Sequence, residues 1–583
     1  MKSQQLFEGK KILRTLQIKH FFYFCIFILG AAVRLIAVFI NPITQSEAII
    51  LLNSVNESSI FSVSPLLSAL INTSFFLFGN SLIPIRIVSA IAGSLILLTP
   101  LLLEKYWGEK EGIALSIFFA IDPFLISNAI QFNGISFTIL FFLIAGAMYL
   151  REKMLLFFLS LFMILLSGNY LIPLILMSGV VICVEIISAN DEISTIKNKL
   201  INKKKILNDQ IQFYKYHLLS ALIFVFIILV LTNTNISSII DILIFDTHMK
   251  KIGGVINPGL IFVSLVSYYP LGMIGFIRII FDDISSILHN KKWVFSIIVL
   301  SYLLIILLPK YSVLELAWVT IPVAFLLSKL FVQDLSRIIN YGREALFWMV
   351  PLMVVVIDLI LILIRSVSPY STSFINYPTM LAVIIGLLII IMIVIFMSYL
   401  RKPSFAKDII LACVGLVFLT FHLSFAWRSA GFGAKPEMEI LWDGGYFTDH
   451  ARISSTIDHA IEKKHGTNAR ISIVNYSKSN PALVWVLGKY SKKNEQSIAS
   501  YRNTPIIVSE SEYIFDGLFE NYRGQSFVVN EKPQWMATPF KSMVTRDYWN
   551  WLFYRIAPPQ KEEKIIWINR AYFPDFIEVE SNT

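Results

Sequence analysis

Long apolar runs separated by short polar segments fill the first three quarters of the chain. A helix that crosses a bilayer needs about 20 predominantly apolar residues. On that rule the pattern predicts about thirteen spans, near residues 20–41, 83–103, 112–130, 136–150, 154–169, 171–188, 217–232, 258–280, 293–308, 312–331, 345–366, 379–400 and 408–427. Residues 1–428 are therefore expected to form an all-α polytopic membrane domain.

The pattern changes after Trp427, where short alternating segments replace the long apolar runs. Helix-like periodicity covers 452–465 and 482–490, and strand-like segments cover 471–474, 505–508, 527–529 and 564–568. Residues 429–583 are thus predicted to form a small α/β domain outside the membrane.

Composition supports the membrane class. Of the 583 residues, 56% are hydrophobic and only 15% are charged, and the mean hydropathy is +0.69. A soluble chain of this length is far more polar. The net charge of +10 does not indicate nucleic acid, because the basic residues lie in short loops between apolar runs. Membrane lipids are the expected partners, and no nucleic-acid partner is expected.

The distribution of basic residues predicts the orientation of the chain. Loops on one side carry most of them, including Lys10, Lys11, Arg14, Lys105, Lys110, Arg151, Lys153, Arg337, Arg343, Arg401 and Lys402. Because cytoplasmic loops are enriched in Lys and Arg, the N-terminus is predicted in the cytoplasm. An odd number of spans then places the C-terminal domain outside an integral protein of the cell membrane.

The segment 41–83 is the first candidate functional region. Pro, Gly and polar residues interrupt it too often for a span, but its short apolar runs suit helices that lie at the membrane surface. Its acidic residues are Glu47 and Glu57. Glu47 could accept a proton from a hydroxyl, or hold a divalent metal such as Mg²⁺ or Mn²⁺ against a phosphate. Alternatively, it caps the helix that follows Ser46.

Further polar candidates lie in and after the third predicted span. Asp122 is inside that span directly before Pro123, and an ionisable residue in a span is a functional candidate. Its structural alternative is a bond to backbone groups that the proline frees. Gln131 and Asn133 form the next outer turn, where their amides could orient a hydroxyl or a phosphate but could not act as a base.

Basic residues near the predicted outer interface are candidate partners for a lipid phosphate. They are His248, Lys250 and Lys251 in one loop, Lys310 at the start of the tenth span, and Arg365 near the end of the eleventh. In the alternative interpretation, the loop cluster meets lipid headgroups, and Lys310 and Arg365 anchor their helices at the interface.

Several short motifs together resemble a known family. They are Arg34, Ser46-Glu47-Ala48, Ser64-Pro65-Leu66, Phe78-Gly79, Arg86, Pro123, Pro436-Glu437, Trp485 to Tyr490, and Tyr548-Trp549-Asn550-Trp551 with Tyr554-Arg555. In this order they resemble GT-C glycosyltransferases of the protein O-mannosyltransferase and ArnT-like branch. The most similar members are the archaeal flippase-activity-associated glycosylation proteins.

The resemblance implies transfer of a sugar from a polyprenyl- or dolichyl-phosphate donor to an acceptor outside the cytoplasm. The family's first outer loop carries Asp-Glu, and its second outer turn carries a second acid. Here the two acid positions are Ser46 and Gly134, so Glu47 remains in the first loop.

Two functions therefore stay open. The first is an enzyme in which Glu47 is the base and the basic candidates hold the donor phosphate. The second is a non-catalytic relative that binds a lipid-linked sugar, or assists its translocation or a partner protein of a glycosylation pathway.

Overall fold

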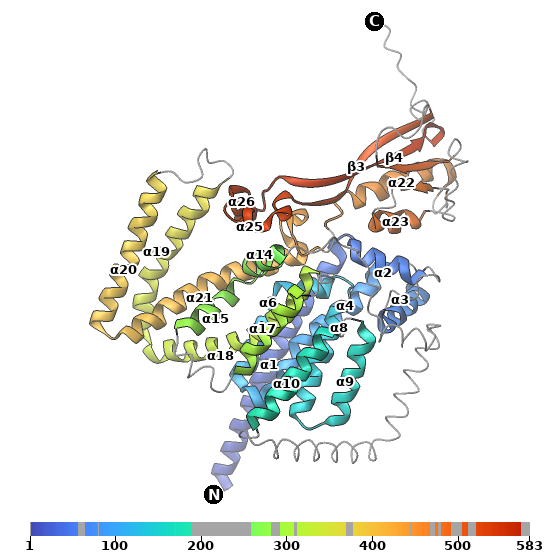
Figure 1. Ribbon diagram of the computed structural model, residues 1–583. Helices are drawn as coiled ribbons and strands as arrows, with labels where there is room; N and C mark the ends of the chain where they lie inside the picture. Colours follow the sequence, from blue (N-terminus) through green and yellow to red (C-terminus); the bar gives the residue numbers. More distant parts are fainter. Residues whose placement is uncertain are drawn as a thin grey trace.

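The computed structural model describes residues 2–55, 64–79, 81–168, 171–188, 258–281, 292–307, 312–368, 377–442, 445–466, 471, 473–475, 480–490, 504–510 and 521–572. Most of the chain is helical, and a small sheet lies at one end of the helical bundle (Figure 1). The N-terminus lies at the opposite end of the bundle. The predicted orientation, with the N-terminus in the cytoplasm and the C-terminal domain outside, stays a prediction.

The first part of the bundle is built around α1 (Lys2–Ile40), which packs against α4 and α6. The remaining elements of this part are α4 (Leu82–Leu95), η2 (Ile96–Leu98), α5 (Thr99–Trp107), α6 (Glu109–Ile121), α7 (Pro123–Ile130), α8 (Ile135–Leu150), α9 (Met154–Ser167) and α10 (Leu171–Ser188). Apolar side chains from these helices form one continuous core with later helices.

The second part comprises α14 (Pro258–Tyr268), α15 (Pro270–Phe281), α17 (Lys292–Leu307), η4 (Val313–Leu316), α18 (Ala317–Tyr341), α19 (Arg343–Val367), α20 (Tyr377–Leu400) and α21 (Pro403–Trp427). Helices α19 and α20 form a pair that projects from the bundle (Figure 1). Only 6% of the apolar window of each is buried, so their aliphatic surfaces suit a lipid environment.

The predicted count of thirteen spans is not confirmed. Within the described ranges, six helices are long and apolar enough to cross a membrane, or seven if α6 and α7 count as one bent span. Helices α8, α9, α14 and the described part of α10 are shorter apolar helices, and the predicted span 258–280 breaks before Pro270 into α14 and α15. The predicted span 217–232 lies outside the described residues. The long apolar helices nevertheless indicate an integral membrane protein.

The C-terminal part contains a four-stranded sheet of order β1-β2-β4-β3, with β1 parallel to β2 and the other pairs antiparallel. Its elements are α22 (His450–His465), β1 (Ile473–Asn475), α23 (Pro481–Gly488), β2 (Ile506–Ser509), β3 (Tyr522–Pro533), α25 (Pro539–Ser542), α26 (Arg546–Tyr554) and β4 (Pro559–Asn569). The predicted α/β character is confirmed, because all four strand-like segments overlap strands. Helix α21 ends at Trp427, next to the predicted domain boundary.

Two short helices of the segment 41–83 lie between the bundle and the C-terminal sheet (Figure 1). They are α2 (Gln45–Val55) and α3 (Pro65–Phe78), and α2 packs on α23. The last residues of α3 are apolar and exposed, with Phe76 at 88%. An exposed apolar tip is compatible with the prediction that these helices lie at the membrane surface, which stays a prediction.

Candidate functional site

Glu47 is part of a capping box at the start of α2. The N–H of Thr44 donates to Glu47 Oε2 at 2.9 Å, and the Thr44 hydroxyl donates to the same oxygen at 3.1 Å. In return, the N–H of Glu47 donates to Thr44 Oγ1 at 3.3 Å. Reciprocal bonds of this kind satisfy the free N–H groups of a helix start, so the Thr-x-x-Glu sequence determines where α2 begins.

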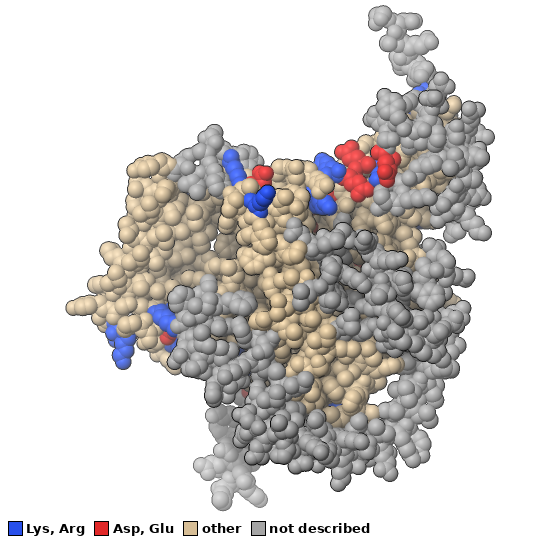
Figure 2. All heavy atoms as spheres, in the orientation of Figure 1, with Lys and Arg blue, Asp and Glu red and all other residues tan. Residues whose placement is uncertain are grey.

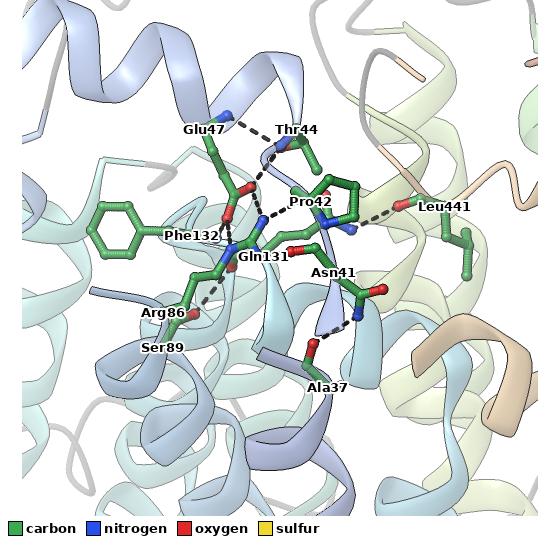
Figure 3. Close-up of polar contacts among 10 residues, drawn as sticks. All are labelled: Ala37, Asn41, Pro42, Thr44, Glu47, Arg86, Ser89, Gln131, Phe132 and Leu441. Carbon is green, nitrogen blue, oxygen red and sulfur yellow. Dashed lines mark hydrogen bonds and ion pairs between the residues drawn. The ribbon is translucent and has the colours of Figure 1, made fainter. Parts of the chain in front are cut away.

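The carboxylate of Glu47 also forms a buried ion pair with Arg86 of α4. Arg86 Nε donates to Oε1 at 2.7 Å, and its Nη2 lies 2.5 Å from Oε2 (Figure 3). The other guanidinium bonds, both 2.7 Å long, reach the carbonyl oxygens of Asn41 and Pro42. Glu47 is 0% and Arg86 1% exposed. A buried pair of this bidentate geometry fixes the loop to the bundle, because neither charge can separate without being left uncompensated.

The same carboxylate binds the second outer turn. The N–H of Phe132 donates to Glu47 Oε1 at 2.9 Å. The side-chain amide of the adjacent Gln131 donates to the carbonyl oxygen of Leu441 at 2.8 Å. The backbone carbonyl oxygen of Gln131 accepts from the Ser89 hydroxyl at 3.1 Å. Glu47 therefore joins the first outer loop, α4 and the turn after α7 (Figure 3).

Gln45 attaches the loop to the C-terminal domain. Its amide Nε2 donates to Asn480 Oδ1 at 2.9 Å, and its Oε1 accepts from the N–H of Ala482 at 3.1 Å. Asn480 caps α23 through the N–H of Leu483. The contact places α23 over the start of α2, so the loop lies between the helical bundle and the C-terminal domain.

These bonds leave Glu47 without a free oxygen. Oε1 accepts from Arg86 and Phe132, and Oε2 accepts from Arg86 and Thr44. To act as the predicted base, the carboxylate would have to exchange one of these partners. The donor set does not fit a divalent metal, because Arg86 already supplies the positive charge. Across the described chain there is no group of three or more His, Cys, Asp or Glu residues that could hold a metal ion.

Asp122 lies at the 58° break between α6 and α7 and is 0% exposed. Its Oδ1 accepts from the N–H groups of Phe124 and Leu125, at 2.8 and 3.0 Å, and so caps α7. Arg34 of α1 is also fully buried and donates to the carbonyl oxygens of Gly30 and Phe119. The geometry matches the structural alternative for Asp122, since Pro123 breaks the helix and the aspartate satisfies the backbone that is freed.

Asn133 stabilises the outer turn. Its Nδ2 donates to Asn128 Oδ1 at 2.9 Å, and its Oδ1 accepts from the N–H of Ile135 at 3.1 Å. Gly134 follows with φ +78°, a conformation that favours glycine. A Cβ at this position would lie 2.9 Å from the carbonyl oxygen of Ser167. The backbone conformation therefore favours glycine at position 134, and an acidic residue there would strain the turn.

The basic candidates cannot all be placed. His248, Lys250, Lys251 and Lys310 lie outside the described residues. Arg365 is exposed in the last turn of α19. Tyr554 and Arg546 hold the C-terminal end of this helix through the carbonyl oxygens of Ile364 and Ser368. The structure does not bring Arg365 into the Glu47 cluster.

The C-terminal domain contributes two ionisable residues near Arg86 that the sequence pattern does not indicate. Burial raises the pKa of Tyr446 to about 12, with Glu437 adding to the effect and Arg86 opposing it. Burial, with positive Arg86 and Lys489 nearby, lowers the pKa of His450. No motif signals Tyr446 or His450, because only the packing of the outer domain brings them close to Arg86.

An apolar cavity of about 260 Å³ lies among α6, α15, α18, α19 and α21. Its wall includes Phe118, Leu271, Ile274, Leu327 and Leu330, and Asp334 also lines it. A cavity with this wall is suited to an aliphatic chain and not to a sugar.

Comparison with known proteins gives only distant structural similarity. No family model matches the chain, and no curated protein matches it. The apo crystal structure of ArnT from Cupriavidus metallidurans is similar at 11% identity and a TM-score of 0.43, over 93% of this chain and 97% of that one. The structure of ArnT from the same organism bound to undecaprenyl phosphate is similar at 12% identity and a TM-score of 0.41, over 80% and 84% of the two chains. Similarity at this level assigns no activity or ligand to this chain.

Proposed function

We propose that this protein is a membrane glycosyltransferase of the GT-C type that takes a sugar from a polyprenyl- or dolichyl-phosphate donor and transfers it to an acceptor outside the cytoplasm. The observation that carries the proposal is the arrangement of the first outer loop. Glu47 holds it on the bundle through Arg86, and Gln45 holds it against the outer domain through Asn480. A loop fixed on both sides can position a polar substrate at the membrane surface.

The apolar cavity within the bundle supports a lipid-linked substrate, since its wall is suited to part of an isoprenoid chain. Arg365 at the outer end of α19 is the described basic candidate for the donor phosphate. His248, Lys250, Lys251 and Lys310 are proposed for the same role, with Gln131 and Asn133 orienting the outer turn. Glu47 is proposed to anchor this site and, if Arg86 releases it, to act as base.

A second function is favoured by the saturation of Glu47. A carboxylate whose two oxygens are both engaged by buried donors is a poor base, and the usual acid positions are Ser46 and Gly134. This favours a relative that binds a lipid-linked sugar without transferring it, and that assists translocation or a partner glycosylation protein.

One experiment separates the two functions. Purified protein is incubated with radiolabelled dolichyl-phosphate hexose, with and without Mg²⁺ or Mn²⁺, and both bound lipid and released lipid phosphate are measured. Release together with sugar on an acceptor supports the transferase. A metal requirement would indicate a metal site other than the saturated Glu47 carboxylate. Tight binding without release supports the second function. If the lipid neither binds nor reacts, both functions are rejected.

A further inference from the structure

A shallow groove of about 570 Å³ lies where the first turn of α19 meets the last turn of α20. It is lined by Arg343, Glu344, Phe347, Trp348, Leu400 and Arg401. This end of the helix pair is opposite the C-terminal sheet, and Figure 2 shows Lys and Arg side chains gathered there. The groove is separate from the Glu47 cluster, and no step of the proposed function uses it.

The charges of the groove are not balanced. Glu344 pairs with Arg401, and each side chain remains 53% exposed. Arg343 is exposed and has no ion pair or hydrogen bond from its side chain within the described part of the chain. Lys402 follows directly and is also exposed. The groove therefore presents the unpaired guanidinium of Arg343 beside that of Arg401, whose orientation Glu344 fixes. Two neighbouring guanidinium groups are suited to binding a phosphate.

The wall above these charges is apolar and aromatic. Phe347 is 71% and Leu400 51% exposed, and the Trp348 ring packs edge-on against Phe347 at 5.4 Å and Phe396 at 5.9 Å between centroids. Helix α19 has 25 residues and is therefore about 37 Å long, slightly more than the hydrocarbon thickness of a bilayer. Arg343 and Arg401 thus lie at the level of lipid headgroups, and the aromatic wall lies at the level where the acyl chains begin.

We propose that this groove binds an anionic phospholipid of the surrounding membrane. The phosphodiester lies between Arg343 and Arg401, and the acyl chains lie along Phe347, Trp348 and Leu400. The positive charge selects an anionic headgroup, and the exposed aliphatic surface of α19 and α20 selects a lipid over a soluble phosphate. The bound lipid would hold together a helix pair that has few protein neighbours.

The test uses the full-length protein in nanodiscs of phosphatidylcholine with a minor fraction of phosphatidylglycerol. Native mass spectrometry after gentle release counts the phosphatidylglycerol molecules retained. The variant is Arg343→Ala/Arg401→Ala. The matched control is Lys435→Ala/Lys541→Ala, which removes two exposed basic residues near the outer end of the molecule. If the double variant does not fold, Arg343→Glu replaces it as the test variant, because this change leaves the Glu344–Arg401 pair in place.

The expected result is preferential retention of phosphatidylglycerol by the unaltered protein and the control. Each basic residue near an anionic lipid strengthens binding roughly fivefold, so the double variant should bind phosphatidylglycerol about thirtyfold more weakly. Arg343→Glu should lose the preference as well. Equal retention by variant and unaltered protein, or an equal loss in the control, would overturn the proposal. Displacement of the lipid by millimolar inorganic phosphate would also overturn it, because an ion site would then suffice.

Discussion

Arg555 of the C-terminal domain forms a buried ion pair with Glu439, with Nε 2.5 Å from Oε1. Glu439 also accepts from the hydroxyl of Tyr268 on α14, and the guanidinium lies 4.3 Å from the centre of the Trp551 ring. The pair therefore joins a helix of the bundle to the outer domain. Its burial means that it holds the two parts in one orientation, although an apolar contact of the same shape could give as much stability.

Removing one member of this pair should destabilise the protein strongly. Glu439→Gln leaves the buried Arg555 without its counter-charge, at an expected cost of about 3–5 kcal/mol. Thermal unfolding in detergent should begin at a lower temperature, with the outer domain becoming accessible to protease first. Glu344→Gln is the control, because its exposed pair with Arg401 contributes less than about 1 kcal/mol. An equal effect of the two changes would contradict the role of the joint.

Gln45→Ala should loosen the outer domain without unfolding the bundle. The change removes the bonds to Asn480 and Ala482 at the start of α23, and leaving buried polar groups unpaired costs about 1–3 kcal/mol. Hydrogen exchange of α23 should accelerate while that of α4 stays unchanged. Gln333→Ala on the exposed face of α18 is the control and should change neither. Unchanged exchange in α23 would show that Gln45 does not hold the domain.

Ser46 and Gly134 stand where the glycosyltransferases that the chain resembles carry an acid, and introducing an acid at each should have different effects. Ser46 is in the first turn of α2, where an added negative charge is favourable, so Ser46→Asp should fold normally and raise any sugar transfer. Gly134→Asp should lower stability by about 1–3 kcal/mol, because its φ is +78° and its Cβ would meet Ser167. Thermal unfolding and the radiolabelled transfer assay measure both effects. A Ser46→Asp protein that binds donor but never transfers it would favour the non-catalytic function.

The stability of the outer domain should fall in mild acid because of His450. Burial and the nearby cations lower the pKa of His450 in the folded protein below its ordinary value of about 6.5. At a pH between the folded-state pKa and about 6.5, His450 is therefore protonated in the unfolded chain but not in the folded one. Stability from this residue is therefore present above pH 6.5 and is lost as the pH falls. His450→Gln should flatten the dependence of unfolding temperature on pH. The control is His459→Gln, an exposed change on the same helix, which should leave the pH dependence of the unfolding temperature unchanged. An unchanged pH dependence in His450→Gln would show that His450 is not its source.

The sequence by itself determined the membrane class, the change of character after Trp427 and the positions of the four strands. These follow from local properties, since the length of an apolar run and the period of alternation do not depend on distant contacts. The sequence also determined the start of α2, because Thr44 and Glu47 are three residues apart and close a capping box on their own.

Only the tertiary structure decided what these residues do. It paired Glu47 with Arg86, placed Phe132 on the same carboxylate and showed that the residue predicted as a base or a helix cap is also a buried anchor. Within the described residues it also showed that the predicted third span bends by 58° before Pro123 and that the predicted span 258–280 breaks before Pro270. Burial and charge compensation depend on residues far apart in the chain, so no local pattern could have predicted them.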